Sequence, residues 1–354
     1  MNSIATYKNP ITIRGDSVYC PLCLCVDSYW GCEPDCLHCF LRALNHTWGK
    51  DFRVAEPSAV ENQLRAGLRN RNPKTPLAWA LSQKKTIRLG NKSDPFQPIE
   101  DDLQVSSRIV EILISMEWSF VVQTRFATRA WKTLRKFANH NRADRPIVHF
   151  MPIVSPGLDK DWELFERMKT DPPEHRVKSA ALATKKGIPS TVQGEPFIPG
   201  FHTPDDFRQA LKLLKSYGIM SYSTYNFHFT PFVAKRIVQI KEVDIERIWY
   251  YNRDDQWRII LKKLLQIADE EGVKVGCPDF VNSGRRIEPF NTCCGIDVPN
   301  PATFNSHHFK RLWLEGKSAQ EILESCWDGT GSWEVGKQIV MGTTKKFYTL
   351  KDIR

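Results

Sequence analysis

Residues 31–40 read Gly-Cys-Glu-Pro-Asp-Cys-Leu-His-Cys-Phe, which places Cys32, Cys36 and Cys39 in a C-x3-C-x2-C pattern. An apolar segment, residues 18–26, comes just before this stretch and is expected to be the first strand of the core. Three thiolates on one short loop can bind three corners of a cubic iron–sulfur cluster and leave the fourth iron open. A closed zinc site would need a fourth protein ligand. The pattern therefore predicts a cluster-binding loop directly after the first strand.

Short apolar runs alternate with helical stretches on both sides of this loop. The expected strands are Val18–Val26, Thr86–Gly90, Ser119–Thr124, Ile147–Val154, Ser190–Phe197, Ile219–Phe227 and Val273–Cys277. The expected helices are Pro57–Arg69, Asp101–Met116, Thr128–Asn139, Lys160–Met168, Glu174–Lys186, Thr203–Tyr217 and Asp254–Glu271. Such alternation predicts an α/β fold with parallel strands joined by right-handed crossovers. About six units of this kind form a full or partial (β/α) barrel, with its chemistry at the carboxyl ends of the strands.

The chain divides at about residue 240. We expect residues 1–240 to form a partial (β/α)6 TIM-type barrel core. Residues 241–354 are expected to form a cysteine-containing C-terminal extension that caps the barrel mouth, because the region after about Cys277 is irregular and rich in Pro, Asn, Cys and His.

The composition is that of a globular protein, with 41% hydrophobic and 25% charged residues in a chain of 354. It excludes wholesale disorder, a fibrous repeat and a coiled coil. No run approaches the roughly 20 apolar residues of a membrane-spanning helix. The N-terminus lacks the apolar core of a signal peptide, so we expect a cytoplasmic protein. The net charge of +10 favours anionic partners, with nucleic acid first among them.

Several motifs, in order, resemble the radical S-adenosylmethionine (radical SAM) superfamily, and within it the spore photoproduct lyase-related branch. After the cysteine loop come Arg42–Phe52, Ile87–Glu100 (IRLGNKSDPFQPIE), Gln123-Thr124-Arg125, Pro172–Arg176 and Glu195–Gly200 (EPFIPG). The resemblance covers roughly residues 18–227. It implies a partial barrel of the radical SAM kind, a [4Fe-4S] cluster, S-adenosylmethionine (SAM) as cofactor, and an electron donor such as flavodoxin or ferredoxin.

The resemblance also implies roles for individual residues. Cys32, Cys36 and Cys39 would ligate the cluster, whose open iron would hold the amino and carboxylate groups of SAM. The residues implied to contact SAM are Phe40 at the adenine end, Ser93 and Asp94 after the second strand, Arg125 at the methionyl carboxylate, and the weaker candidate Ser155. Asp27 and Glu195 are left open between a place inside the barrel and a structural hydrogen-bonding role.

The sequence departs from the spore photoproduct lyases at two places. Those lyases carry a cysteine just before the Ser-Asp pair, whereas residues 90–94 here read Gly-Asn-Lys-Ser-Asp. They also place tyrosines beside the third cluster cysteine, where this chain has His38 and Phe40. We therefore expect rearrangement or functionalisation of a substrate carbon in place of thymine-dimer repair by the usual hydrogen relay.

Six further cysteines suggest a second metal site, either an auxiliary iron–sulfur cluster or a structural zinc. These are Cys20, Cys23, Cys25, Cys277, Cys293 and Cys294. The first strand and the C-terminal extension could bring them together. The alternative is that they are small buried hydrophobic residues, since Cys23 and Cys25 alternate as strand residues do.

The expected substrate is a thymine-type or modified pyrimidine base of DNA, or the corresponding nucleoside. Aromatic residues that could stack on bases are Trp249, Tyr250, Tyr251, Trp313, Trp327 and Trp333, and His307 and His308 could act near a substrate. Two alternatives stay open. One is a radical SAM enzyme that acts on a small molecule or a protein side chain with an auxiliary cluster, and the other is a non-catalytic zinc protein that binds nucleic acid.

Overall fold

The computed structural model describes residues 4–13, 22–41, 52–73, 75–142, 144–277, 294–301, 290, 292, 315, 316 and 321. The strands are β1 (Ala5–Tyr7), β2 (Ile11–Ile13), β3 (Leu24–Val26), β4 (Tyr29–Trp30), β5 (Arg53–Ala55), β6 (Ile87–Leu89), β7 (Phe120–Thr124), β8 (Val148–Pro152), β9 (Val192–Phe197), β10 (Ser221–Asn226) and β11 (Lys274–Gly276). The helices are α2 (Pro57–Arg69), α3 (Pro76–Ser82), α4 (Glu100–Leu103), α5 (Val105–Ser115), α6 (Ala127–Leu134), the 3-10 helix η1 (Arg135–His140), α7 (Asp159–Leu164), α8 (Pro173–Lys185), α9 (Pro204–Ser216), α10 (Pro231–Ile237), α11 (Ile245–Tyr251) and α12 (Asp254–Glu271).

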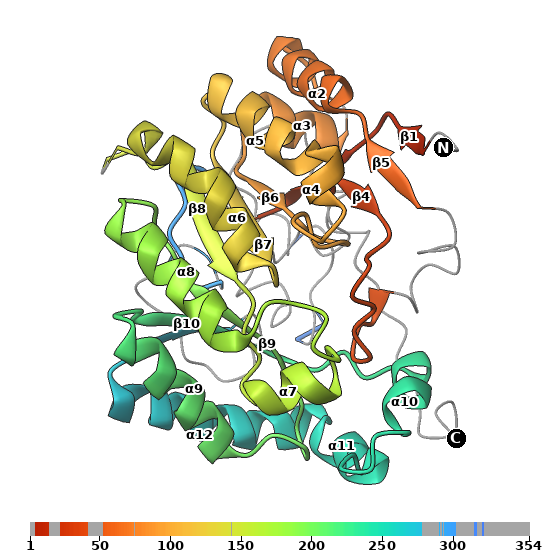
Figure 1. Ribbon diagram of the computed structural model, residues 1–354, viewed down its shortest axis with the longest axis vertical. Coiled ribbons are helices and arrows are strands. Elements are labelled where there is room, and N and C mark those ends of the chain that lie inside the picture. Colours follow the sequence, from red (N-terminus) through yellow and green to blue (C-terminus); the bar gives the residue numbers. More distant parts are fainter. Residues whose placement is uncertain are drawn as a thin grey trace.

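Most core strands run parallel to their neighbours, and the neighbours follow one another along the chain. Strands β3, β6, β7 and β8 are parallel neighbours, with β2 antiparallel at their edge. Strands β9, β10 and β11 form a second parallel set. The parallel bridges Phe150–Ser190 and Ile153–Gln193 connect β8 to β9 and the residues just before it. The predicted α/β fold with parallel strands is thus confirmed, and Figure 1 shows the helices packed along these strands.

The sequence patterns located these elements well. Every predicted strand overlaps an observed one, from β3 to β11. The predicted helix at 101–116 is divided into α4 and α5, because Gln104 between them has a left-handed φ of 51°. The predicted start at Thr203 is confirmed, since Thr203 and Asp206 form a capping box at α9. The short helices α3, α10 and α11 were not predicted.

Two apolar cores lie between strands and helices. In the first, residues of β3, β6, β7 and β8 such as Leu24, Ile87 and Val122 pack against α2, α3, α5 and α6. In the second, residues of β9, β10 and β11 pack against α8, α9 and α12. Both α12 and β11 follow residue 240, so the described core extends beyond the predicted end of the barrel region.

The opposite face of the first strand set is covered at its amino end by residues 294–300. Cys294, Ile296 and Val298 pack against Leu22, Val121 and Met151, and the Thr86 N–H donates to the Asn300 carbonyl at 3.0 Å. This described part of the C-terminal region therefore lies at the end of the sheet away from the cysteine loop. Most of the region after residue 301 lies outside the described residues, and for it the predicted cap stays a prediction.

One histidine on this covered face should make stability depend on pH. His149 on β8 is fully buried, with Nδ1 3.3 Å from the Phe120 carbonyl, and burial lowers its pKa from 6.5 to about 4. Between these values the unfolded chain binds a proton that the folded chain does not. Stability is therefore complete above the unfolded pKa and is lost as pH falls toward the folded one. We expect His149 to lower the free energy of unfolding by about 2 kcal/mol when the pH falls from 7 to 5.

Urea unfolding of the His149→Gln variant at both pH values checks this expectation. The acid-induced loss should shrink by that amount, whereas His140→Gln, at an exposed histidine, should leave the loss unchanged. An equal loss in the wild type and the His149→Gln protein would contradict the assignment.

Candidate active site

The three cysteines of the predicted motif lie on the loop that follows β4. Cys36 is buried, and Cys32 and Cys39 are half-buried. The Cys39 N–H donates to the Cys36 carbonyl at 3.1 Å, which folds the second half of the loop into a tight turn. Because β3 runs parallel to β6 and β7, this loop lies at the carboxyl end of the sheet, where loops from neighbouring strands meet.

Charged and amide groups from distant parts of the chain fix the loop. Arg236 of α10 donates to the Cys36 carbonyl at 3.1 Å and pairs with the Asp35 carboxylate at 2.6 Å. Arg167 also reaches Asp35, at 3.3 Å. On the other side, the Gln97 side chain accepts from the Glu33 N–H at 2.7 Å. These contacts hold the loop in one conformation before any ligand binds.

The thiols share an environment that disfavours their charged form. Burial raises the pKa of the Cys32 thiol well above its ordinary value, with smaller contributions from Asp94 and Cys36. Burial raises the pKa of Cys36 to about 12, against the opposing effect of Arg125. Thiolates at such positions need a cation to offset their charge, and iron ions supply it. The electrostatic coupling of the three thiols fits a shared metal centre.

The arrangement fits a cluster better than a single ion. Within the part of the chain that the structure describes, no three His, Cys, Asp or Glu side chains converge as ligands of one metal ion. A cubane attaches each thiolate to a different iron, so its ligands need not converge on one point. The three thiols on one loop are therefore suited to a [4Fe-4S] cluster with one open iron.

Hydrogen bonds hold the loop after β6 against β4 and Asp27, next to the cysteine loop. One oxygen of the buried Asp27 accepts backbone N–H groups of Asn91, Lys92 and Ser93 at 2.9, 2.6 and 3.3 Å. The Ser93 hydroxyl donates to the Tyr29 carbonyl at 2.7 Å. Asp27 therefore has a structural hydrogen-bonding role, and the Ser93 hydroxyl ties this loop to β4.

Asp94 joins the same loop to the end of β7. Its carboxylate accepts from the Thr124 hydroxyl at 2.6 Å and from the Arg125 N–H at 2.6 Å. Its backbone N–H donates to the Cys32 sulfur. Asp94 thus touches the cysteine loop through its main chain, while its carboxylate is satisfied within the protein.

A buried charge network lies beside the cysteine loop. The Arg125 guanidinium pairs with Glu166 through Nη1, and Glu166 pairs with Arg176, whose side chain is 1% exposed. Burial alone would raise the pKa of Glu166, but the two arginines lower it to about 2. Arg125 and Arg176 lower the pKa of the Cys36 thiol, whereas Glu166 raises it. The two guanidinium groups thus favour the thiolate form on the loop.

His38, between Cys36 and Cys39, belongs to this network. Its Nε2 lies 3.2 Å from Nη2 of Arg125, and burial, with a smaller effect of Arg125, lowers its pKa to about 3. The imidazole is therefore neutral. Because the guanidinium can only donate, Nε2 accepts and the proton lies on Nδ1. Buried Nδ1 has no hydrogen-bond partner among the described residues.

The residues predicted to contact SAM lie near the loop, and their contact with SAM stays a prediction. Arg125 lies at the predicted place, with one side of its guanidinium held by Glu166 and the other donating to the Glu195 carbonyl at 3.1 Å. The Ser155 hydroxyl donates to the same carbonyl at 3.1 Å. Phe40 packs against His228 with ring centroids 4.4 Å apart.

The cysteines proposed for a second metal site lie in different parts of the structure. Cys23 packs in the first core, Cys277 in the second, and Cys294 on the opposite face beside Arg88, at 3.3 Å from Nη2. Cys25 is paired with Arg88 across β3 and β6. Cys20 and Cys293 lie outside the described residues, as do His307, His308, Trp313, Trp327 and Trp333. Cys25 and Cys294 thus both lie next to Arg88, whereas Cys23 and Cys277 pack in separate cores. A second metal site stays a prediction.

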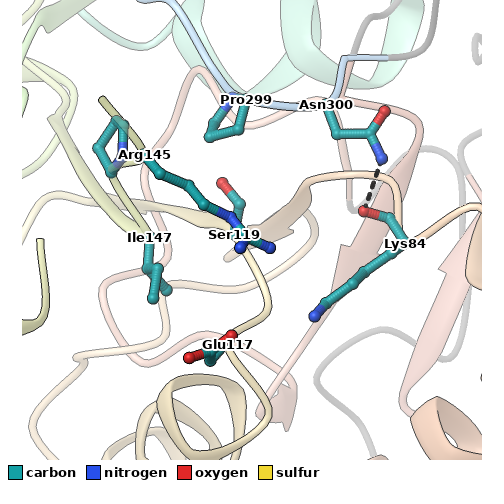
Figure 2. Close-up of a pocket in the computed structure, with 8 residues that line it drawn as sticks. Lys84, Glu117, Ser119, Arg145, Ile147, Pro299 and Asn300 are labelled. Atoms are coloured by element: carbon teal, nitrogen blue, oxygen red, sulfur yellow. Dashed lines mark hydrogen bonds between the residues drawn. The ribbon is translucent and has the colours of Figure 1, made fainter. Parts of the chain in front are cut away.

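A cavity of about 230 Å³ lies at the other end of the sheet (Figure 2). It is lined by Lys84, Glu117, Ser119, Arg145, Pro146, Ile147, Pro299 and Asn300, several of which directly precede β6, β7 and β8. The Asn300 amide donates to the Lys84 carbonyl at 3.0 Å across its edge. The cavity shares no residue with the cysteine loop and its supports, so the candidate chemistry does not lie there.

A curated protein resembles part of this chain. It is the Radical SAM Nalpha-GlyT isomerase of Pseudomonas phage M6, which is 23% identical over 164 residues. This similarity bears out the resemblance to the radical SAM enzymes that the sequence motifs predict. The match covers 44% of this chain but 33% of the phage protein, so the chain spans about a third of that relative's length. No family model matches the chain.

The fold is similar to that of a solved enzyme structure. A point mutant of spore photoproduct lyase superposes with a TM-score of 0.56 at 12% identity, over 75% of this chain and 79% of that one. SuiB of Streptococcus suis bound to S-adenosylmethionine gives a TM-score of 0.45 at 11% identity, over 71% and 51% of the two chains. The similarity to the lyase structure supports a shared fold.

Among the described helices, none combines the length and the apolar character of a membrane-spanning segment.

Sequence reasoning missed the buried network around Glu166. Neither Glu166 nor Arg176 was singled out, and His38 was noted only as a departure from related lyases. The sequence contained one signal for Arg176: it is the last residue of the motif Pro172–Arg176, which forms the start of helix α8. A charged residue inside a motif marks a candidate for a buried ion pair, but its partner is set by the fold.

Proposed function

We propose that this chain is a radical SAM enzyme whose Cys32, Cys36 and Cys39 hold a [4Fe-4S] cluster. The observation that carries the proposal is the set of three coupled thiols on one preorganised loop, beside the guanidinium groups of Arg125 and Arg176. When bound, the cluster and SAM supply a 5′-deoxyadenosyl radical that takes a hydrogen atom from the substrate. An external one-electron donor such as flavodoxin or ferredoxin would reduce the cluster.

The protein's own residues orient these groups. Glu166 fixes the Arg125 guanidinium, and Arg125 in turn fixes the His38 ring beside the cluster ligands. The Asp94 carboxylate ties the loop after β6 to β7, so that the loops around the cysteines move as one unit. We further propose that the parallel strands β3 to β10 curve into the partial (β/α)6 barrel typical of the superfamily, with SAM and substrate enclosed at the carboxyl ends.

The proposed substrate is a thymine-type or modified pyrimidine base of DNA. The net charge of +10 supports an anionic polymer, and the motifs of residues 87–100 and 195–200 support a reaction related to that of the lyases. A base in a duplex would have to be flipped out to reach the cysteine loop.

The proposed reaction is a rearrangement. Residues 90–94 offer no thiol that could return a hydrogen atom to the product, and the phage relative is named an isomerase. SAM, if bound, would supply the carrier that takes the hydrogen atom and returns it in a rearrangement. It would then be regenerated or consumed in less than one equivalent per product. A second metal site is not part of this proposal, because Cys23 and Cys277 lie in different cores.

Anaerobic turnover tests the proposal. The reconstituted protein is incubated with SAM, dithionite and one candidate substrate at a time. The candidates are single-stranded DNA, duplex DNA, free thymidine, and Nα-GlyT, which the name of the phage relative specifies. An isomerisation should leave the mass of the digested nucleoside unchanged and shift its chromatographic retention. With SAM deuterated at the 5′ carbon, deuterium should enter the product.

Two outcomes would contradict the proposal at different levels. Absence of 5′-deoxyadenosine under every condition, despite a full complement of iron, would exclude radical SAM chemistry. Formation of 5′-deoxyadenosine that DNA and nucleosides leave unchanged, but that a peptide stimulates, would exclude the nucleic-acid substrate and retain the chemistry.

A further inference from the structure

Helix α11 and the turn that follows it carry two neighbouring tyrosines flanked by two arginines. Arg253 lies 5.4 Å from the ring centroid of Tyr250, Tyr250 lies 5.0 Å from Tyr251 in an edge-to-face contact, and Arg247 lies 5.9 Å from Tyr251. We call these four residues the arginine–tyrosine ladder. Tyr250 is 47% exposed, and Tyr251 is half-buried. The ladder therefore presents flat ring surface and positive charge to solvent.

The neighbouring residue of α11 shows that this exposure is specific. Trp249 turns inward and packs on Phe229 at 6.0 Å, within a core that also contains Leu37 of the cysteine loop. Of the three consecutive aromatic residues singled out in the sequence, Trp249 therefore anchors the helix. Tyr250 and Tyr251 do not belong to that core.

The ladder lies at the carboxyl end of the sheet. The Asn226 amide, at the end of β10, donates to the Asn252 carbonyl at 3.5 Å. In the turn after β9, a Cβ on Gly200 would lie 2.8 Å from the Arg247 carbonyl, so α11 packs directly against that turn. The preceding helix, α10, contacts the cysteine loop through Arg236. Figure 1 shows α10 and α11 following one another along this edge.

Two guanidinium groups on this edge can contact a polyanion, although residues 231–255 contain five basic and five acidic residues and carry no net charge. Arg253 pairs with Asp255 at 2.9 Å, but both side chains are more than half exposed, so a phosphate can compete for the guanidinium. Arg247 makes no ion pair among the described residues.

We propose that the arginine–tyrosine ladder binds the single-stranded DNA segment that flanks the reacting base. Bases would stack on Tyr250 and Tyr251, and Arg247 and Arg253 would contact phosphates or stack in turn. This inference rests on the proposed DNA substrate and adds the surface that holds it next to the cysteine loop.

DNA binding by the full-length reconstituted protein tests this inference without turnover. Fluorescence anisotropy with a labelled single-stranded thymine-rich oligonucleotide gives the affinity at several salt concentrations. Loss of one stacked base in Tyr250→Ala should weaken binding by about 5- to 150-fold. Loss of two phosphate contacts in the double variant Arg247→Gln/Arg253→Gln should reduce the slope of log affinity against log salt by about 1.4.

Matched controls come from α9 and the residue that follows it. Arg208, an arginine that pairs with Glu270 and Glu271, and Tyr217, which bonds to Glu174, lie away from α11. Arg208→Gln and Tyr217→Ala should bind DNA as the wild type does. Because the ladder is exposed, its variants should keep the wild-type melting temperature and iron content, which separates lost contact from misfolding.

The outcomes distinguish this inference from the proposed function. Ladder variants that bind with wild-type affinity and salt slope overturn the ladder alone. A wild-type protein that binds no DNA at low salt, yet forms 5′-deoxyadenosine with another substrate, overturns the ladder and the DNA substrate but leaves the radical chemistry. Ladder-dependent binding to DNA that is never converted supports the ladder and overturns DNA as substrate.

Discussion

A Cys36→Ala variant should lose its iron–sulfur cluster and, with it, all cleavage of SAM. Three thiolates are the protein's whole share of the ligands, because the fourth iron is left open. Removing one leaves too few to hold a cubane on a partly exposed loop. Iron should fall from about four atoms per chain to near zero, with loss of visible charge-transfer absorbance and of 5′-deoxyadenosine.

Cys277→Ala provides the matched control. Cys277 is also a fully buried cysteine, but it packs in the second core, far along the chain from the loop. This variant should keep the full iron content and its spectrum. If Cys36→Ala retained iron, or if Cys277→Ala lost it, the assignment of Cys32, Cys36 and Cys39 as the ligand set would be wrong. Zinc in place of iron in the anaerobically purified protein would contradict it as well.

The largest effect on folding is expected from Glu166→Gln. The variant leaves the guanidinium groups of Arg125 and Arg176 facing each other without the carboxylate between them. Breaking a buried ion pair by removing one partner costs about 3–5 kcal/mol. Urea unfolding at neutral pH measures this loss. If the Glu166→Gln protein binds iron, the midpoint potential of its cluster should rise. Loss of the Glu166 carboxylate leaves more positive charge nearby, and this charge favours the reduced, more negative state of the cluster.

An exposed ion pair serves as control for Glu166. Asp101 pairs with Arg129 at 2.7 Å, and its side chain is 64% exposed. Asp101→Asn should cost less than about 1 kcal/mol and leave the potential unchanged. Equal stability losses in the two variants would show that the Glu166 network is not desolvated as the structure indicates.

The Cys36→Ala and Glu166→Gln predictions concern residues with different roles in the same site. The cysteines would hold the cluster. Among the described residues, Glu166 bonds to Arg125, Thr170 and Arg176, so it would act on the cluster through Arg125 and His38. Glu166 is therefore a positioning residue. A potential that moves without loss of iron distinguishes this role from a purely structural one.

Much of the fold was determined locally. The strands β6 to β11 and the helices α2, α8, α9 and α12 were located from apolar periodicity, since alternation and helical spacing depend only on near neighbours. The spacing of Cys32, Cys36 and Cys39 also lies within one short loop, so the sequence alone identified the candidate cluster ligands. The start of α9 at Thr203 was readable for the same reason, because a capping box spans four residues.

What the sequence could not determine involves partners far apart in the chain. The pairing of Glu166 with Arg125 and Arg176 depends on how the loop after β7 packs against α7 and α8. Two further features depend on which faces the cores cover. One is the placement of Cys23 and Cys277 in separate cores, and the other is the exposure of Tyr250 beside Trp249, which packs on Phe229. Local patterns fix which residues can form an element or a loop. Burial and charge pairing are properties of the whole packed chain, and only the tertiary structure decided them.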